Sequence, residues 1–196
     1  MKIILASASP RRRELLAELG CRFEIITADI DENIPERDPA AHVCILAERK
    51  AMAVREKAGD DALIIAADTV VCADGEILGK PCDRADAERM LRMLSGRRHE
   101  VISGIAVGIN GRVHTAYEST AVTFKRLSDR EISAYLNTNE PYDKAGAYAV
   151  QGIASLFIER IEGDYFNVVG LPRHRLYELL CKLGISASEV FTLLGV

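Results

Sequence analysis

The sequence has 196 residues, of which 48% are hydrophobic and 28% charged, and this composition excludes an intrinsically disordered or fibrous chain. Asp and Glu outnumber Lys and Arg by 29 to 25, so the net charge is -4, which disfavours sequence-independent binding to nucleic acid. No apolar run approaches the roughly 20 residues that span a bilayer, and Ile3–Leu5 is too short for a signal peptide. We therefore expect a cytoplasmic protein without a membrane or nucleic-acid partner.

The first third of the chain alternates between strand and helix signals. Ile3–Leu5 is an apolar run typical of a short buried strand. The first helix is predicted to begin at Pro10, because Ser9 can cap it, and to end before Gly20. A second helix is predicted over residues 38–58, where apolar residues recur at helical spacing, and a second apolar strand follows it.

The remaining elements include two predicted hairpins. Asp74-Gly75 and Asn110-Gly111 are two-residue turn signals between β-rich runs. Further helices are predicted at residues 83–94, from the capping-box sequence at Ser128 onward, and at residues 172–183. A strand is predicted at residues 155–161. No linker composition or internal repeat divides the chain. We therefore expect an α/β fold with a mixed sheet, in a single domain over residues 1–196.

Arg11, Arg12 and Arg13 lie in the first turn of the first predicted helix. The positive end of the helix dipole makes cations unfavourable there, so an anion would offset the cost. A phosphate at this place would meet backbone N–H groups and guanidinium groups together. The alternative is an arginine run on a solvated face.

Asp68 follows the apolar strand that begins near Leu63. An ionised carboxylate in such a strand costs free energy unless a cation or a metal meets it, although a strand-end aspartate can also reach solvent. A two-residue turn at Asp74-Gly75 would pair Thr69 with Lys80, and a turn one residue longer would pair Asp68 with Lys80. Either register brings Lys80 near the acid, which suggests metal-assisted chemistry on a phosphate.

Three other positions are candidates with weaker signals. Glu32 lies in an acidic segment that could supply the hard oxygens Mg²⁺ prefers, or could be an acidic surface turn. Lys50, on the second predicted helix, is by default a solvated lysine. Gln151 lies in a polar, glycine-bearing loop that could bind a small planar ligand. The sequence contains neither a P-loop nor a dinucleotide fingerprint.

The run Leu-Ala-Ser-Ala-Ser-Pro-Arg-Arg-Arg-Glu-Leu-Leu at residues 5–16 resembles the opening signature of the Maf family of nucleotide pyrophosphatases. Further segments agree with that family in order, over nearly the whole chain, at residues 67–71, 79–81, 95–99, 140–152 and 163–172. The resemblance implies a Maf/ITPase-like fold, with two lobes of mixed sheet and helices around a central cleft, and a homodimer. It also implies hydrolysis of a nucleoside triphosphate to the monophosphate and pyrophosphate with a divalent metal cation, Mg²⁺ or Mn²⁺.

The resemblance also assigns roles position by position. Asp68 resembles the family's proton acceptor, and Glu32 and Asp68 would hold the metal. Lys50 and Lys80 resemble its polar residues around the metal and phosphates. The positive charges that would neutralise the departing pyrophosphate are Arg11, Arg12, Lys50 and Lys80.

Three positions resemble those that separate the substrate branches of the family. Arg11, Thr69 and Gln151 resemble the branch that acts on dTTP and UTP, whereas the 7-methyl-GTP branch is expected to carry Trp, Gln and Glu there. An amide at Gln151 offers a donor and an acceptor to the O4 and N3–H edge of uracil or thymine. The resemblance also suggests clearance of modified nucleotides and a link to cell-division arrest. The alternatives are a 7-methyl-GTP-type enzyme or a non-catalytic nucleotide-binding regulator of septum formation.

Overall fold

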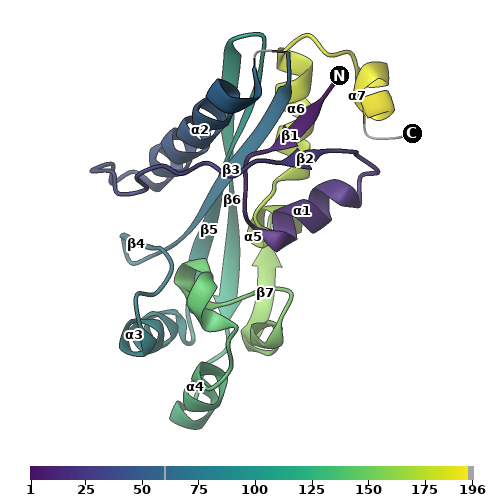
Figure 1. The fold of residues 1–196 in the computed structure, drawn as a ribbon. Coiled ribbons are helices and arrows are strands. Elements are labelled where there is room, and N and C mark those ends of the chain that lie inside the picture. Colours follow the sequence, from purple (N-terminus) through teal and green to yellow (C-terminus); the bar gives the residue numbers. More distant parts are fainter. Residues whose placement is uncertain (60, 194–196) are drawn as a thin grey trace. The chain divides into compact units, whose positions relative to one another are not determined.

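The computed structural model describes residues 1–59 and 61–193 (Figure 1). The strands are β1 (Ile3–Leu5), β2 (Glu24–Ile25), β3 (Leu63–Ala73), β4 (Glu76–Leu78), β5 (Arg98–Ile109), β6 (Arg112–Phe124) and β7 (Ile158–Glu162). The α-helices are α1 (Pro10–Ala17), α2 (Pro39–Ala58), α3 (Arg84–Leu94), α4 (Asp129–Leu136), α5 (Tyr165–Val169), α6 (Arg173–Lys182) and α7 (Ala187–Leu193). Short 3-10 helices lie at Pro141–Asp143, Ala145–Ala147 and Ile153–Phe157. None of the helices in the described ranges is both long and apolar enough to cross a membrane.

The described strands form one mixed sheet. Its order is β2-β1-β3-β5-β6-β7, and β4 pairs with β3 beside this path. β1 runs parallel to β2 and to β3, whereas β4 is antiparallel to β3 and β7 is antiparallel to β6. Helices precede and follow these strands along the chain, as the sequence of elements shows. The predicted α/β fold with a mixed sheet is therefore confirmed.

The chain folds into two compact units. The first unit contains Met1–Asp68, Ser103–Glu118 and Gly170–Val196, and the second contains Thr69–Ile102 and Ser119–Val169. The strands β3, β5 and β6 therefore each contribute residues to both units. Because each unit is assembled from separate stretches of sequence, no linker marks its limits. The expected single domain over the whole chain stays a prediction.

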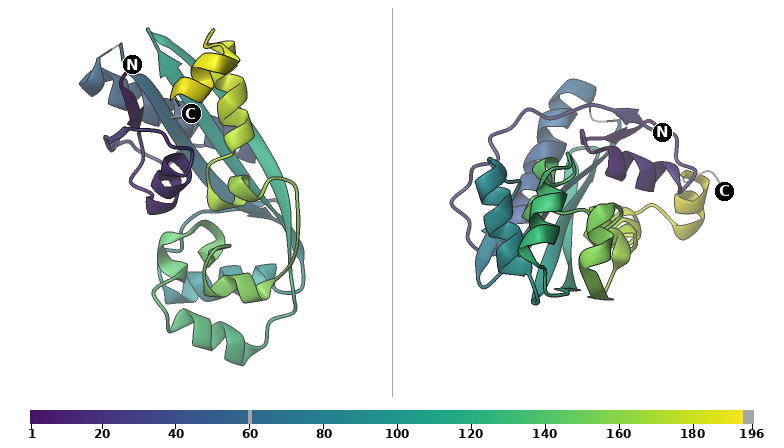
Figure 2. Two further views of the ribbon diagram at one scale, coloured as in Figure 1. Left: turned by 90° about the vertical axis from the view of Figure 1, so that its right-hand side faces the viewer. Right: turned by 90° about the horizontal axis from the view of Figure 1, so that it is seen from below.

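In the first unit, α2 packs against the strands β1, β3 and β5 (Figures 1 and 2). The buried residues of this core are small or β-branched, and they are Ile4, Ala6, Ala47, Ala51, Val54, Ala62, Ile64, Ala66 and Ala106. Gly104 on β5 permits the close approach, because a Cβ there would lie 2.4 Å from the carbonyl carbon of Val43 on α2. The helix begins at Asp38, whose carboxylate accepts a hydrogen bond of 3.1 Å from the Ala41 N–H.

The second unit is organised around aromatic rings. Phe124 lies 5.0 Å from His99 and 4.8 Å from Tyr148 between ring centroids, both in edge-to-face geometry. The His99 Nε2 atom and the Tyr148 hydroxyl form a buried hydrogen bond of 2.9 Å. Burial lowers the pKa of His99 to about 4, so the imidazole is neutral at pH 7. This neutral pair fixes the segment after α4 against β5.

The structure selects one of the two registers predicted for the first hairpin. Asp74 and Gly75 both have positive φ, and Ala73 pairs with Glu76 across a two-residue turn. This register would set Thr69 opposite Lys80, as the shorter turn predicts, but the ladder between β3 and β4 ends at the pair Val71 and Leu78. The alternative register, with Asp68 opposite Lys80, is wrong because the turn has two residues and not three.

Several element boundaries differ from the predictions. The strand predicted to start at Ser155 starts at Ile158, because the preceding residues form the 3-10 helix Ile153–Phe157. Ser9 is the N-cap residue of α1 by position, but its side chain makes no capping hydrogen bond. The predicted capping box at Ser128 and Glu131 is present in both of its hydrogen bonds. The sequence analysis predicted neither β2 nor the short helices α5 and α7.

Candidate active site

Lys50 lies between two carboxylates in the first unit. Its Nζ atom is 2.7 Å from Asp68 Oδ1 and 2.7 Å from Glu32 Oε1. The side chains of Lys50 and Asp68 are each 12% exposed, whereas that of Glu32 is 53% exposed. One ammonium group therefore joins a buried carboxylate to one that opens to solvent, and these charge-assisted bonds are of the short, strong kind.

The expectation that Lys50 is a solvated lysine is wrong. Leu46 and Val54, four residues before and after Lys50 on α2, are both buried, so Lys50 projects from the core-facing side of the helix. The spacing of four is visible in the sequence and is the signal that could have identified this lysine. A lysine on an apolar helix face has to meet an anion, because an unpaired buried ammonium is costly.

Asp68 is the last residue of β3 that belongs to the first unit. It follows the buried Ala66 and Ala67 and is itself only 9% exposed. The prediction that a cation meets this carboxylate is confirmed, but the cation is the ammonium of Lys50 on α2. Glu32 reaches the same ammonium from the irregular segment between β2 and α2.

Arg12 adds a second positive charge to this cluster. Its Nε–H donates to the Gly170 carbonyl oxygen at 2.8 Å, and its Nη1 donates to the Ser7 hydroxyl at 3.3 Å. Burial lowers the pKa of the Arg12 guanidinium, and the charges of Asp68 and Glu32 act in the opposite direction. An arginine remains a cation under these conditions, so the cluster contains two positive and two negative groups.

Ser7 was not singled out in the sequence. It is 8% exposed, and its hydroxyl accepts from the Ser9 N–H at 3.2 Å as well as from Arg12. Its place in the run at residues 5–16, before the arginines, is the signal that could have indicated it. Arg11, in the first turn of α1, is partly buried, whereas Arg13 is exposed.

The other predicted site residues belong to the second unit. Thr69 follows Asp68 directly on β3 and is partly buried, and Lys80 and Gln151 are exposed. The backbone before Gln151 contacts the backbone before Lys80, since the Gly146 N–H donates to the Gly79 carbonyl at 3.0 Å. The second unit therefore brings the segments that carry Lys80 and Gln151 into contact.

The donor set of the first unit fits a hard divalent cation. Asp68 and Glu32 are carboxylates that reach the same nitrogen atom, so their oxygens lie close together. Magnesium is usually bound by one or two carboxylates together with water and substrate phosphates. The described residues contain no group of three or more His, Cys, Asp and Glu side chains that could hold a metal. Further ligands would therefore come from water and phosphate oxygens.

The fold and this cluster define an α/β protein with paired carboxylates, a buried lysine and an arginine, a set suited to binding and cleaving phosphates. The chain belongs to the Maf family, since residues 2–183 match the family model described as Maf-like protein. It is 53% identical to the dTTP/UTP pyrophosphatase of Caldanaerobacter subterraneus subsp. tengcongensis over 92% of this chain and 88% of that protein. It is 50% identical to the dTTP/UTP pyrophosphatase of Thermosipho africanus over 96% of this chain and 97% of that protein.

Among solved structures, the chain is similar to the Ham1 protein of Staphylococcus aureus, with a TM-score of 0.45 and 14% identity over 80% of this chain and 91% of that chain. It is also similar to a HAM1 protein from Coxiella burnetii, with a TM-score of 0.45 and 17% identity over 65% of this chain and 74% of that chain.

Proposed function

We propose that this protein hydrolyses dTTP and UTP to the nucleoside monophosphate and pyrophosphate. The observation that carries the proposal is the ammonium of Lys50 between Asp68 and Glu32, 2.7 Å from each. The proposal is supported by membership of the Maf family and by relatives near 50% identity that are dTTP/UTP pyrophosphatases, such as that of Thermosipho africanus at 50%.

Asp68 is the proton acceptor in this proposal. Lys50 donates to Oδ1, so in this proposal Oδ2 is the oxygen that takes a proton from an attacking water. The water attacks the α-phosphorus, the bond from that phosphorus to the bridging oxygen breaks, and pyrophosphate leaves. Because Asp68 lies in a largely buried strand, its position changes little while the proton moves.

Positive charges around this carboxylate stabilise the charge that develops on the leaving pyrophosphate. Arg12 is held by Gly170 and Ser7, so its guanidinium is already oriented before substrate binds. Arg11 and Lys50 would add to the same effect, and the family resemblance gives Lys80 the same role. A divalent cation held by Glu32 and Asp68 would supply Lewis-acid stabilisation of the phosphate charge.

We also propose that Arg11, Thr69 and Gln151 determine the preference for a pyrimidine base. These three residue types are the ones that resemble the dTTP and UTP branch. The exposed amide of Gln151 offers one donor and one acceptor, the pattern that complements the N3–H and O4 atoms of uracil and thymine. The metal would be Mg²⁺ or Mn²⁺, the assembly a homodimer and the location the cytoplasm. The proposals on the metal, the assembly and the location rest on the family resemblance. Sedimentation would test the homodimer directly.

Product analysis tests the proposed reaction. Wild-type protein with Mg²⁺ should convert UTP and dTTP to monophosphate and pyrophosphate, and Asp68→Asn should lower kcat about 10²–10⁴-fold because the proton acceptor is lost. Chelation of the metal should also abolish turnover. Release of orthophosphate and the nucleoside diphosphate would contradict cleavage between the α and β phosphates. Nucleotide binding without turnover by both proteins would instead indicate a regulator, and a preference for 7-methyl-GTP would overturn the base assignment.

A further inference from the structure

Gln151 has an exposed side chain on a backbone that is fixed on both sides. Val150 before it is 7% exposed and Ala154 shortly after it is buried completely. On the amino-terminal side, the Tyr148 hydroxyl is bonded to the buried His99. On the carboxyl-terminal side, the fixed point is a carboxylate that is distant in sequence, Glu140. A side chain that reads a base has to be held in this way, because a mobile one loses conformational entropy on binding.

Glu140 accepts three hydrogen bonds. Its Oε2 atom accepts from the Ile153 N–H at 2.8 Å, and its Oε1 atom accepts from the Ala154 N–H at 3.1 Å. Oε1 also accepts from the Tyr135 hydroxyl at 3.0 Å. The carboxylate thus joins α4, which carries Tyr135, to the two residues that start the 3-10 helix Ile153–Phe157.

The two bonds to backbone act as a helix cap supplied from elsewhere in the chain. The N-cap residue of that 3-10 helix is Gly152, which has no side chain to cap it. A Cβ at Gly152 would lie 2.1 Å from Glu140 Oε2, so the carboxylate occupies the space that a side chain would fill. Glu140 therefore contacts Gly152, the residue next to Gln151, and accepts hydrogen bonds from the two residues after Gly152.

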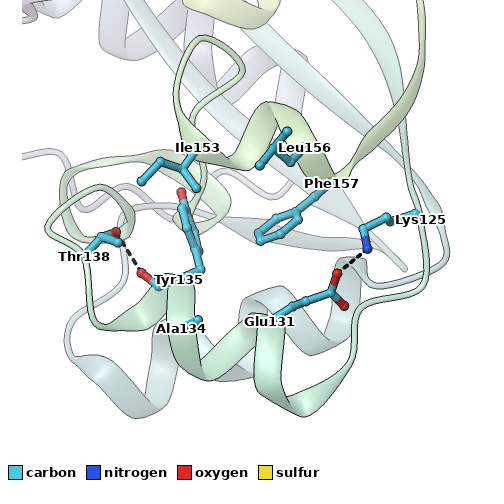
Figure 3. Close-up of a pocket in the computed structure, with 8 residues that line it drawn as sticks. All are labelled: Lys125, Glu131, Ala134, Tyr135, Thr138, Ile153, Leu156 and Phe157. Atoms are coloured by element: carbon cyan, nitrogen blue, oxygen red, sulfur yellow. Dashed lines mark hydrogen bonds and ion pairs between the residues drawn. The ribbon is translucent and has the colours of Figure 1, made fainter.

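Figure 3 shows the surroundings of this contact. Tyr135 lies with its ring beside Phe157 and its hydroxyl directed toward Ile153. The Tyr135 and Phe157 rings meet edge to face, with centroids 5.2 Å apart. Packing of the Tyr135 ring holds the hydroxyl that donates to Glu140, and this limits the positions that the carboxylate can adopt.

We propose that Glu140 is a positioning residue that holds Gln151 in the orientation that reads the base, and so sets the selectivity for pyrimidine nucleotides. This inference rests on the proposed function, in which Gln151 meets the base. Glu140 acts through the backbone of Gly152–Ala154 and does not itself touch the reacting atoms. The contacts at Tyr148 and Gly146 remain when Glu140 is changed, so the variants alter one side of the segment only.

Glu140→Gln tests the inference with almost no change in size. The amide retains one acceptor oxygen but places an NH₂ donor where the second oxygen accepts, facing a backbone N–H. Glu131→Gln is the matched control, since Glu131 also accepts a backbone N–H, that of Ser128 at 2.8 Å, together with the Ser128 hydroxyl and Lys125. That control weakens a cap of α4 in the same unit, and Glu131 is not one of the groups that donate to Glu140.

The main measurement is kcat/KM for UTP relative to GTP. We expect Glu140→Gln to lower this ratio about tenfold, mainly by raising KM for UTP. Glu131→Gln should keep the ratio within about twofold of wild type. The double variant Glu140→Gln with Gln151→Ala should match Gln151→Ala alone within about twofold, because the first residue acts through the second. Losses that simply multiply, or an equal loss in the control, would overturn the inference.

Amide hydrogen exchange separates a failure of the inference from a failure of the proposed function. Exchange of the Ile153 and Ala154 amides should accelerate about tenfold or more in Glu140→Gln and not in Glu131→Gln. Unchanged exchange overturns the inference whatever the enzyme does. If the wild-type protein releases no pyrophosphate from UTP or dTTP, the proposed function fails, and with it the link between Glu140 and base selectivity.

Discussion

Replacing Lys50 with methionine removes the ammonium from the centre of the candidate site and keeps most of the side-chain volume. The change breaks two contacts of 2.7 Å, to Asp68 and to Glu32. The two lost contacts contribute unequally to stability, because the side chain of Asp68 is 12% exposed and that of Glu32 is 53% exposed. The cost is therefore set mainly by Asp68, which would keep a buried charge without its ammonium partner.

Removal of one partner of a fully buried ion pair costs about 3–5 kcal/mol. Here the value should be lower, because Arg12 still faces Asp68 electrostatically and Glu32 is solvated. We expect Lys50→Met to lower the free energy of unfolding by about 2–3 kcal/mol at pH 7. The methionine stem recovers some of the apolar packing of the lysine stem on α2, so the electrostatic loss dominates.

The fall in activity should exceed what the loss of stability explains. In the proposed reaction the ammonium orients the proton acceptor and faces the phosphates, and loss of a preorganised charge of this kind costs about 10²–10³-fold in kcat. Urea denaturation measures the stability, and pyrophosphate release from UTP measures the rate. Lys57→Met is the matched control, since Lys57 lies on the same helix, is exposed, and contacts the Thr27 carbonyl at the long distance of 3.5 Å.

The control should remain within about 0.5 kcal/mol of wild type and keep its activity. Combining Lys50→Met with Asp68→Asn should restore part of the lost stability, because the buried side chain that lost its ammonium partner is then neutral. If Lys50→Met is as stable and as active as Lys57→Met, the ion pair has no structural or chemical role and our reasoning is refuted.

Two further predictions concern the cores of the two units. Burial lowers the pKa of His99 from its ordinary value of 6.5 to about 4 in the folded protein. The stability that depends on a neutral imidazole is therefore fully present above about pH 6.5 and is lost as pH falls toward 4. Urea titrations of wild type should show about 3 kcal/mol more loss over that window than those of His99→Gln, and equal slopes would contradict the assignment. Gly104→Ala should destabilise the protein by about 2–4 kcal/mol, because its Cβ would lie 2.4 Å from the Val43 carbonyl on the helix backbone. Gly79→Ala, which meets nothing within 4 Å, is the control, and equal melting temperatures for the two variants would show that α2 can move away from β5.

The sequence predicted those parts of the fold that depend on local chemistry. Turn dipeptides such as Asp74-Gly75 and capping residues such as Asp38 act on the few residues beside them, so the hairpins and helix starts follow from short patterns. The strand predicted from Ser155 failed at its start because Glu140, thirteen residues before Ile153, caps a 3-10 helix there. No window of local sequence contains that contact.

The partner of Asp68 shows the same limit at the candidate site. The predicted hairpin register indicated Lys80 as the partner of Asp68, because strand pairing can be counted along the chain. The structure instead brings Lys50 to the carboxylate, and this requires α2 to pack on β3 through its apolar face. Helical spacing could have placed Lys50 on that face, but only tertiary packing determines which strand residue it meets.

Sequence motifs that resemble a family mix residues of the chemistry with residues that hold the fold, and the structure separates the two. Asn167 is completely buried, and its Nδ2 atom donates to the Val101 carbonyl and to the Thr120 hydroxyl, each at 2.9 Å. It therefore ties α5 to β5 and β6. Arg173 donates to the Leu15 carbonyl at 2.7 Å and so joins α6 to α1. Variants at such positions should lower activity only as far as they lower stability, whereas variants of Lys50 or Gln151 should lower activity by more than their loss of stability explains. That excess loss is the criterion by which a motif residue is assigned to the reaction.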